Sequence, residues 1–398
     1  MITKTKKFIL IFSSIFCAVL ICTALFLKFF SISESNLIAF YRVPEKVQTA
    51  VIDLINSKTE NKNKAFEALV LDSSISLESQ NKIIKKCSCL IYTNDSATEK
   101  FLNTRAMPVG LSVANGFPNS IVNSLKIKNN GANAEKTIKI IPFLYDFYEI
   151  DINYPIYKKT GMKSLDVWND LIEAAYYEKS FTKAPLILPF AEDRDFVNIM
   201  GLIAEALCGY EAYEKMTEKF DIEAALASDQ PLGIAAKEIR GLLKSGIIPQ
   251  DSLNFKADDI LFYMDYELSG INFTTLSQHR KISNKIANNY TSIYCPSKEF
   301  TPDRKFAAEQ ISVSLLKNND SAKQLITDLT DNLQSELATL TGLSPVQKNC
   351  GVPDHQTDDV RFWLAASKGP VMPLANLIGS EDDIKSLANR LRDLVREE

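Results

Sequence analysis

Polar and aromatic residues follow several of the predicted strands, and these are the side chains that could bind a ligand. The carboxyl ends of strands in a mostly parallel sheet meet at one edge, which is where such sheets bind ligands. The relevant pairs are Tyr41-Arg42, Asp72-Ser73, Thr93-Asn94 and Tyr145-Asp146. Polar residues also end strands simply because loops are exposed to solvent. Each pair taken alone is therefore compatible with a ligand site and with an ordinary exposed loop.

Motifs of covalent or metal-dependent catalysis are absent from the sequence. There is no Gly-rich phosphate loop, no G-x-S-x-G and no H-E-x-x-H. The two histidines, His279 and His355, are far apart in sequence, and Cys87-x-Cys89 has no second cysteine pair near it. The apolar run CSCLIY favours buried strand residues over a metal site. We therefore expect a binding protein rather than an enzyme, with no cofactor and no metal.

Composition indicates a globular protein of two domains. The chain has 398 residues, of which 46% are hydrophobic and 24% charged, with a formal net charge of −4. The charges are spread without blocks, which argues against a nucleic-acid partner. Five cysteines outside the N-terminal run are irregularly spaced, so a disulfide framework is not expected.

The N-terminus predicts export from the cytoplasm. Lys4, Lys6 and Lys7 precede Phe8 to Leu27, a run of twenty residues without a charge. Such a run is long enough to cross a membrane as a helix, and the lysines orient it with the body outside. Residues 1–34 are thus either an uncleaved anchor, which we favour, or a removed signal peptide. Either interpretation makes the folded body extracytoplasmic, periplasmic or on the cell surface.

Strands and helices alternate along the body, which predicts an α/β fold with mainly parallel sheets flanked by helices. The expected strands are 37–41, 66–71, 89–92, 137–142, 260–264 and 290–294. The expected helices include one from Thr301 that carries Phe306, Ile311 and Leu315, and one over 321–341. Trp168 lies on the apolar face of a predicted helix, which favours a core position.

Two segments share one pattern, a buried strand followed by aromatic and acidic residues. The first lies within Ile138 to Leu171 and contains Tyr145 and Asp146, and the second is Ile260 to Glu267. We interpret both as strands that pass between two lobes.

The order of these features resembles the solute-binding proteins of ABC importers, in particular the maltose-type sugar-binding group. The resemblance covers most of the body from Leu37 and rests on short motifs in a fixed order. These motifs are IPFLYDFYEIDIN, YKKTG, SLDVWNDL, ILFYMDY and LATLTGLSPV. It implies a two-lobed fold that closes on a ligand by a hinge motion.

The resemblance also implies lobe boundaries and a site. The N-terminal lobe would comprise 35–144 plus 266–318, and the C-terminal lobe 145–265 plus 319–398. A sugar would be held by aromatic faces and planar polar groups. The six candidate ligand-binding residues are Arg42, Asn94, Tyr145, Asp146, Tyr266 and Trp363. Asp146 and Tyr266 rank first because they end the two crossing strands.

Two functions remain open. One is delivery of a small polar solute, a sugar or oligosaccharide, to an ABC permease in the membrane. The other is a transport-independent, membrane-anchored sensor or interaction module. The second is favoured by the lack of a lipid-attachment cysteine with small residues before it, since Phe16 precedes Cys17 and Ile21 precedes Cys22.

Overall fold

A computed structural model describes residues 37–58, 65–128, 137–283, 285–299, 304–352 and 354–396. The predicted anchor or signal segment, residues 1–34, lies outside the described residues. Within the described ranges, every helix is too short or too polar to cross a membrane.

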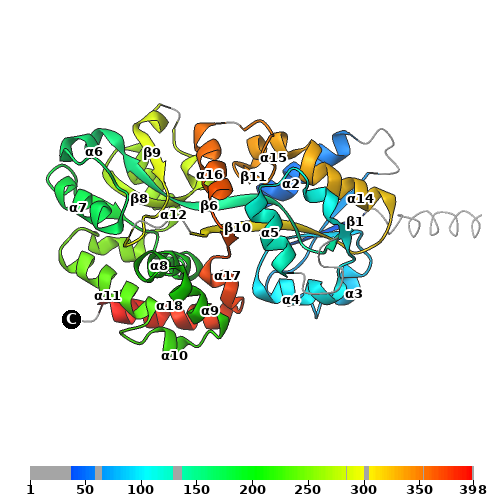
Figure 1. Cartoon of the computed structure of the whole chain (residues 1–398), viewed down its shortest axis with the longest axis horizontal. Helices are drawn as coiled ribbons and strands as arrows, with labels where there is room; N and C mark the ends of the chain where they lie inside the picture. The colour runs from blue at the N-terminus through cyan, green and yellow to red at the C-terminus, as the bar shows by residue number, and fades with distance from the viewer. Residues whose placement is uncertain are drawn as a thin grey trace, which may run out of the picture.

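One mixed sheet runs through the whole molecule, with helices on both sides (Figure 1). Its main strand order is β2-β1-β3-β10-β6-β8-β7. These strands are β1 (Leu37–Tyr41), β2 (Glu67–Val70), β3 (Cys89–Thr93), β6 (Ile141–Asn153), β7 (Ala184–Ile187), β8 (Ser269–Thr275) and β10 (Phe306–Leu315). The short strands β9 (Tyr290–Ile293) and β11 (Ser344–Pro345) pair with β6, and β12 (Pro370–Val371) pairs with β10. A separate pair joins β4 (Val109–Gly110) and β5 (Thr137–Ile138).

The predicted α/β class is confirmed, with a sheet that is mixed rather than mainly parallel. Pairing is parallel at the two outer parts, where β1 lies between β2 and β3 and where β7 joins β8. Pairing is antiparallel in the centre, where β10 joins β3, and where β6 joins both β10 and β8. The central strands are the ones that pass from one side of the molecule to the other (Figure 1).

Strand β6 belongs to two hydrophobic cores. Its first half contributes Phe143 and Phe147 to a core that also contains β1 and the end of β10. Its second half contributes Ile150 and Ile152 to a core built on α8 and α11. At about 3.3 Å per residue, a strand of 13 residues spans about 43 Å, which is enough to reach across both cores.

Helices cover each side of the sheet. Those around the first core are α2 (Glu45–Ser57), α3 (Asn81–Ile84), α4 (Ser96–Arg105), α5 (Asn119–Lys128), α14 (Asp320–Thr327), α15 (Gln334–Thr341) and α16 (His355–Ala366), with η3 (Leu111–Ala114) and η6 (Asp328–Asn332). Those around the second are α6 (Tyr154–Thr160), α7 (Trp168–Glu178), α8 (Asp193–Cys208), α9 (Tyr210–Glu218), α10 (Ile222–Ala225), α11 (Pro231–Lys244), α12 (Ala257–Asp265), α13 (Leu276–His279), α17 (Leu374–Ile378) and α18 (Glu381–Arg396), with η4 (Gln250–Asn254) and η5 (Ala287–Asn289).

The strand predicted over 260–264 is wrong, because this segment lies in helix α12. The buried residues of α12 are Ile260, Leu261 and Met264, which is helical spacing. The Asp259 carboxylate accepts a hydrogen bond from the Lys256 backbone N–H at 2.8 Å and so closes the first turn. A short apolar run cannot distinguish strand from helix by itself, and this acidic first turn was the missed signal.

The helix predicted to carry Phe306, Ile311 and Leu315 is also wrong, because these residues form β10. Ile311, Val313 and Leu315 alternate into the first core, which is strand spacing. The returning strand is therefore β10, antiparallel to β6, and the lobe boundary expected at 265 loses its basis.

Trp168 lies in the core, as predicted. Its side chain is among the largest fully buried ones, and its indole N–H donates to Glu238 Oε1 at 3.0 Å.

We predict that Trp168→Ala lowers the free energy of unfolding by about 3–5 kcal/mol through loss of apolar contacts and the cavity left behind. Guanidinium titration followed by circular dichroism measures this loss. Trp168→Phe should lose clearly less, and a Trp168→Ala loss below about 1 kcal/mol would show that the residue is not part of the core.

Candidate functional site

A cleft is lined by residues at the ends of β1 and β3, at the starts of α8 and α18, and in α17. Its volume of about 450 Å³ falls within the usual range for a small-molecule site. The residues that line it are Arg42, Pro44, Ser73, Ser74, Thr93, Asp95, Arg194, Glu309, Asn376 and Glu381. A second recess of about 390 Å³ adjoins it and shares Arg42, Ser74, Asp95 and Glu381.

Arg42 forms one wall of the cleft directly after β1. Its backbone is left-handed, with φ of 56°, which is uncommon for a non-glycine residue. Thr93 holds this turn by donating its hydroxyl to the Arg42 carbonyl at 2.6 Å. The guanidinium forms an ion pair with Asp95 at 2.8 Å. The turn therefore fixes a cation at the edge of the sheet where β1 and β3 both end.

The opposite wall carries a second arginine, Arg194, in the first turn of α8. Its guanidinium donates to Asn376 Oδ1 at 2.9 Å and pairs with Glu381 at 2.5 Å. Glu381 also lies 3.6 Å from Arg42, so one carboxylate bridges cations on the two sides of the cleft. These side chains are partly exposed, and each pair alone stabilises the fold little. Their guanidinium and carboxylate groups can instead exchange partners with a polar ligand.

The strand carboxylate that lines the cleft is Glu309. Glu309 on β10 lies opposite Asp146 on β6 in the sheet register. Burial, together with the nearby Asp146, raises the pKa of Glu309 to about 7, although Arg194 opposes the rise. Burial and Glu192 likewise raise the pKa of Asp195, at the start of α8, to about 6. Near neutral pH a protonated Glu309 can donate a hydrogen bond as well as accept one.

Asp146 is held by the chain itself. It accepts hydrogen bonds from the Ser277 backbone N–H at 2.9 Å, the Ser277 hydroxyl at 2.6 Å and the Thr275 hydroxyl at 3.1 Å. Burial raises its pKa, and these hydrogen bonds oppose the rise. Asp146 therefore fixes the turn from β8 into α13 against the middle of β6.

The six residues predicted for the site lie in different places. Arg42 lines the cleft, and Asn94 is buried beside it. The Asn94 amide donates to Glu99 at 2.8 Å, and its backbone carbonyl accepts from Asn376 at 2.9 Å. Tyr145 is buried next to a separate small cavity of about 110 Å³ between α4, α5 and β10.

The remaining two predicted aromatic residues lie apart from the cleft lining. Trp363 on α16 packs edge-on near Tyr294, with ring centroids 6.2 Å apart. Tyr266 is 64% exposed after the end of α12 and packs against Phe262. Its high rank depended on the strand that proved to be α12.

The residues missed from sequence are Arg194, Glu309 and Glu381. Arg194 and Glu381 lie in the first turns of helices α8 and α18, whose existence was predicted. Charged first turns were the available signal, but only the folded chain brings both helix starts against Arg42. Glu309 lies on β10, a segment for which the sequence predicts a helix.

Comparison with known proteins identifies the fold. No protein-family model and no curated protein matches the sequence. Among solved structures, the bacterial solute receptor AcbH matches with a TM-score of 0.70 at 11% identity, covering 92% of this chain and 94% of that chain. This chain has a solute-binding-protein fold. The binding protein MsmE of Bacillus subtilis gives 0.71 at 11% identity, covering 91% and 93% of the two chains. RafE of Streptococcus pneumoniae gives 0.67 at 12% identity, covering 91% and 96%.

The raised pKa of Glu309 gives this solute-binding fold a pH dependence that can be tested. A carboxyl whose pKa is higher in the folded state favours folding at low pH, and this contribution is lost as pH rises from about 4 to about 7. Glu309→Gln removes the loss, so it should raise the free energy of unfolding at pH 8, relative to wild type, by on the order of 1 kcal/mol more than at pH 5. Denaturant titrations at the two pH values measure the difference. The exposed Glu67→Gln is the control, and an equal effect of Glu309→Gln at both pH values would contradict the account.

Proposed function

We propose that this protein is an extracytoplasmic binding protein that captures a small polar solute, a sugar or oligosaccharide, for delivery to an ABC importer. The observation that carries the proposal is a cleft in which cations and carboxylates from both sides face one another. Solved structures of similar fold are described as a receptor for β-D-galactopyranose, a raffinose complex and a stachyose complex. In this role the protein binds the solute and does not chemically change it.

The lobes that would close divide along the two hydrophobic cores. In β6 the division falls between Phe147 and Tyr148, because the first belongs to one core and the second to the other. In β10 it falls near the start of the strand, where Ala307 packs against the C-terminal core while Phe306 and Ala308 pack in the other. Under this division residues 269–293 lie with the C-terminal lobe and helices α14 to α16 with the N-terminal lobe, unlike the division at 265 and 318 expected from sequence. The change follows from the returning strand, which is β10.

Direct contacts between these lobes favour the closed arrangement. The Asn376 side chain donates to the Asn94 carbonyl, and Glu381 approaches Arg42. Gly379 lies so close to α4 that an added Cβ would be 2.8 Å from the Ser96 hydroxyl. A solute that contacts both lobes only when they are closed would shift the population further toward this state.

Four residues are proposed to contact the solute. Arg42, Arg194 and Glu381 present planar charged groups that can bind two neighbouring hydroxyls, and Glu309 lies beneath them. Asn94 and Asp146 are proposed as positioning residues, because their polar groups are already bonded to the chain. This set keeps Arg42 from the sequence prediction and replaces Tyr266 and Trp363.

The N-terminal apolar run would hold the protein at the outer face of the cytoplasmic membrane, close to a permease. One similar structure is described as a probable secreted solute-binding lipoprotein, which fits an extracytoplasmic place. The second candidate function, an anchored sensor or interaction module, is favoured by the bulky residues before Cys17 and Cys22, which do not form a lipid-attachment site. Loss of sugar uptake on deletion of the gene would support delivery, and unchanged uptake would support the sensor.

Thermal shift against a saccharide panel tests the proposed binding. The full chain in detergent is screened with galactose, raffinose, stachyose, chitin oligosaccharides, sugar acids and polyols. A ligand at 100 times its Kd stabilises the folded state by about 2.7 kcal/mol, so we expect a rise in Tm of several degrees with at least one of them.

Variants of the two walls then locate the site. Arg42→Ala should weaken binding of that saccharide about tenfold or more, since a charge-assisted hydrogen bond is lost. Tyr266→Ala, at an exposed position away from the cleft lining, is the control and should bind like wild type. If no polar solute shifts the Tm, the transport proposal fails, and if Tyr266→Ala weakens binding more than Arg42→Ala, the site is misplaced.

A further inference from the structure

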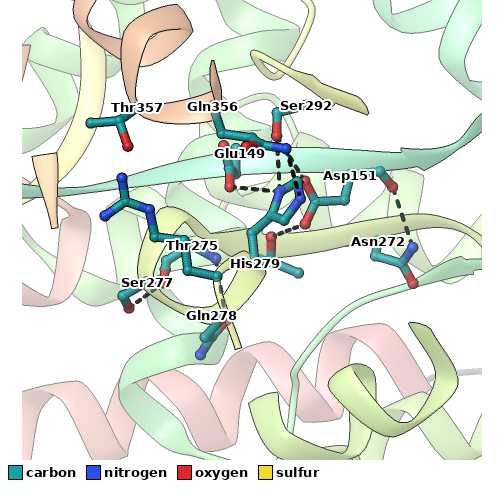
Figure 2. A network of polar contacts seen from close by, with 12 residues as sticks. Glu149, Asp151, Asn272, Thr275, Ser277, Gln278, His279, Ser292, Gln356 and Thr357 are labelled. Atoms are coloured by element: carbon teal, nitrogen blue, oxygen red, sulfur yellow. Dashed lines mark hydrogen bonds and ion pairs between the residues drawn. The ribbon is translucent and has the colours of Figure 1, made fainter. Parts of the chain in front are cut away.

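A buried polar cluster lies on the second half of β6, apart from the cleft lining (Figure 2). Residues 148, 150 and 152 of this strand point into the hydrophobic core, so Glu149 and Asp151 point to the opposite face. There they meet His279 of α13 and Ser292 of β9. Glu149 and Asp151 are 0% exposed and His279 is 3% exposed.

The donor atoms of this cluster converge on one point. His279 Nδ1 lies 2.6 Å from Asp151 Oδ1 and 3.2 Å from Glu149 Oε1. The Ser292 hydroxyl oxygen lies 3.0 Å from the same ring nitrogen. Within the described part of the chain, this is the set of three histidine, cysteine or acidic residues whose ligand atoms all lie within 4.8 Å of one another.

Within this cluster, Glu149 lacks a full set of hydrogen-bond donors, although its Oε1 lies 3.2 Å from His279 Nδ1. Neither of its carboxylate oxygens accepts a hydrogen bond from a described residue. The nearest donors are already engaged, because Ser292 gives its hydroxyl proton to Asp151 at 3.0 Å and His279 Nδ1 lies closest to Asp151. A buried carboxylate without a donor costs free energy, and a second carboxylate beside it adds repulsion.

Among the described residues, the neighbouring cation Arg280 forms its ion pair with another carboxylate, although its charge also acts on Glu149. Arg280 follows His279 in the chain, but its guanidinium lies 2.7 Å from Asp354 and donates to the Ala338 carbonyl at 3.3 Å. The cluster therefore presents two carboxylates to a single imidazole in a site closed to water, which is the charge pattern that a bound cation would balance.

We propose that Glu149, Asp151 and His279 bind one divalent transition-metal ion of the zinc class. One imidazole nitrogen and two carboxylate oxygens are ligands that Zn²⁺ and Mn²⁺ accept, whereas Ca²⁺ and Mg²⁺ prefer sites made of oxygen alone. Ligand atoms bound at about 2.1 Å to one ion lie roughly 3.0 to 3.4 Å apart. The 3.2 Å between His279 Nδ1 and Glu149 Oε1 already fits, whereas the 2.6 Å between Nδ1 and Asp151 Oδ1 would have to lengthen.

Neighbouring side chains hold the ligands in place. Thr274 donates to Asp151 Oδ2 at 2.6 Å, which leaves Oδ1 turned toward the ring. The Gln356 carboxamide lies 3.4 Å from His279 Nε2, and its oxygen can accept the Nε2 proton when the amide is turned about (Figure 2). That bond leaves Nδ1 as the metal-binding nitrogen.

The ion would have a structural role. Its ligands come from β6, α13 and β9, and α13 begins at the turn that Asp146 fixes. Metal binding would thus tie these elements together just beyond the point where β6 enters the second core.

Metal analysis of the full chain tests the proposal, with the second histidine as a matched control. The protein is stripped with a chelator, incubated with micromolar Zn²⁺ or Mn²⁺, desalted and measured by inductively coupled plasma mass spectrometry. We expect about one equivalent of metal in wild type and in His355→Gln, since His355 is exposed and belongs to another element. We expect less than a tenth of an equivalent in His279→Gln and in Asp151→Asn.

Thermal shift provides a readout that does not depend on the variants folding normally. Chelation should lower the Tm of wild type by several degrees and Zn²⁺ should restore it, whereas Mg²⁺ or Ca²⁺ should not. If stripped wild type retains its Tm and takes up neither Zn²⁺ nor Mn²⁺, the proposal is overturned and the cluster is an imidazolium shared by two carboxylates. Equal uptake by His279→Gln and wild type would overturn it as well. Neither result depends on whether the cleft binds a saccharide.

Discussion

The continuity of strand β6 is the constraint on which the rest of the structure depends. Thirteen residues run unbroken through two hydrophobic cores, and their alternation sets what each face meets. The face that carries Tyr145 and Phe147 supplies one core, and the opposite face, with Ile150 and Ile152, supplies the other. Asp146, Glu149 and Asp151 receive their partners from strands and helices more than 120 residues away. Because a strand cannot bend freely while both halves are paired, relative motion of the cores must be absorbed where β6 and β10 pass between them.

The cleft brings charged side chains from two sides of the molecule together. Arg42 and Arg194 approach from opposite sides, and Glu381 lies within reach of both. Exposed ion pairs of this kind are nearly balanced against water, so a polar ligand can replace one partner at little cost. Burial raises the pKa values of Glu309 and Asp195, and a neighbouring carboxylate adds to each rise.

The sequence could predict most elements but not the connection between them. Strands β1, β3 and β9 and helices α2, α8, α11 and α18 follow from apolar periodicity and capping residues. The prediction for 260–264 is wrong because five consecutive apolar residues fit the spacing of a strand as well as that of a helix. The acidic first turn of α12 is the signal that favours the helix. The rank of Tyr266 rests on a strand at this segment, which is α12, and the strand that returns between the cores is β10.

The site was less predictable, for a physical reason. Arg42 could be found because it directly follows a strand, where ligands bind in such sheets. Arg194 and Glu381 lie 187 residues apart in the chain, and only tertiary packing sets one beside the other. His279 was discounted because its only fellow histidine is remote, yet its partners are carboxylates on β6. Spacing along the chain does not indicate which residues become neighbours through the pairing of distant strands.

Closure of two lobes on a polar solute is the central claim, and small-angle X-ray scattering tests it most directly. The full chain in detergent is measured with and without the saccharide that gives the largest thermal shift, with the detergent matched out by contrast. We expect a smaller radius of gyration of the protein at saturating saccharide than without it, because the ligand populates the closed state. A radius that stays unchanged or grows while the saccharide is bound would contradict a hinge that closes on its ligand.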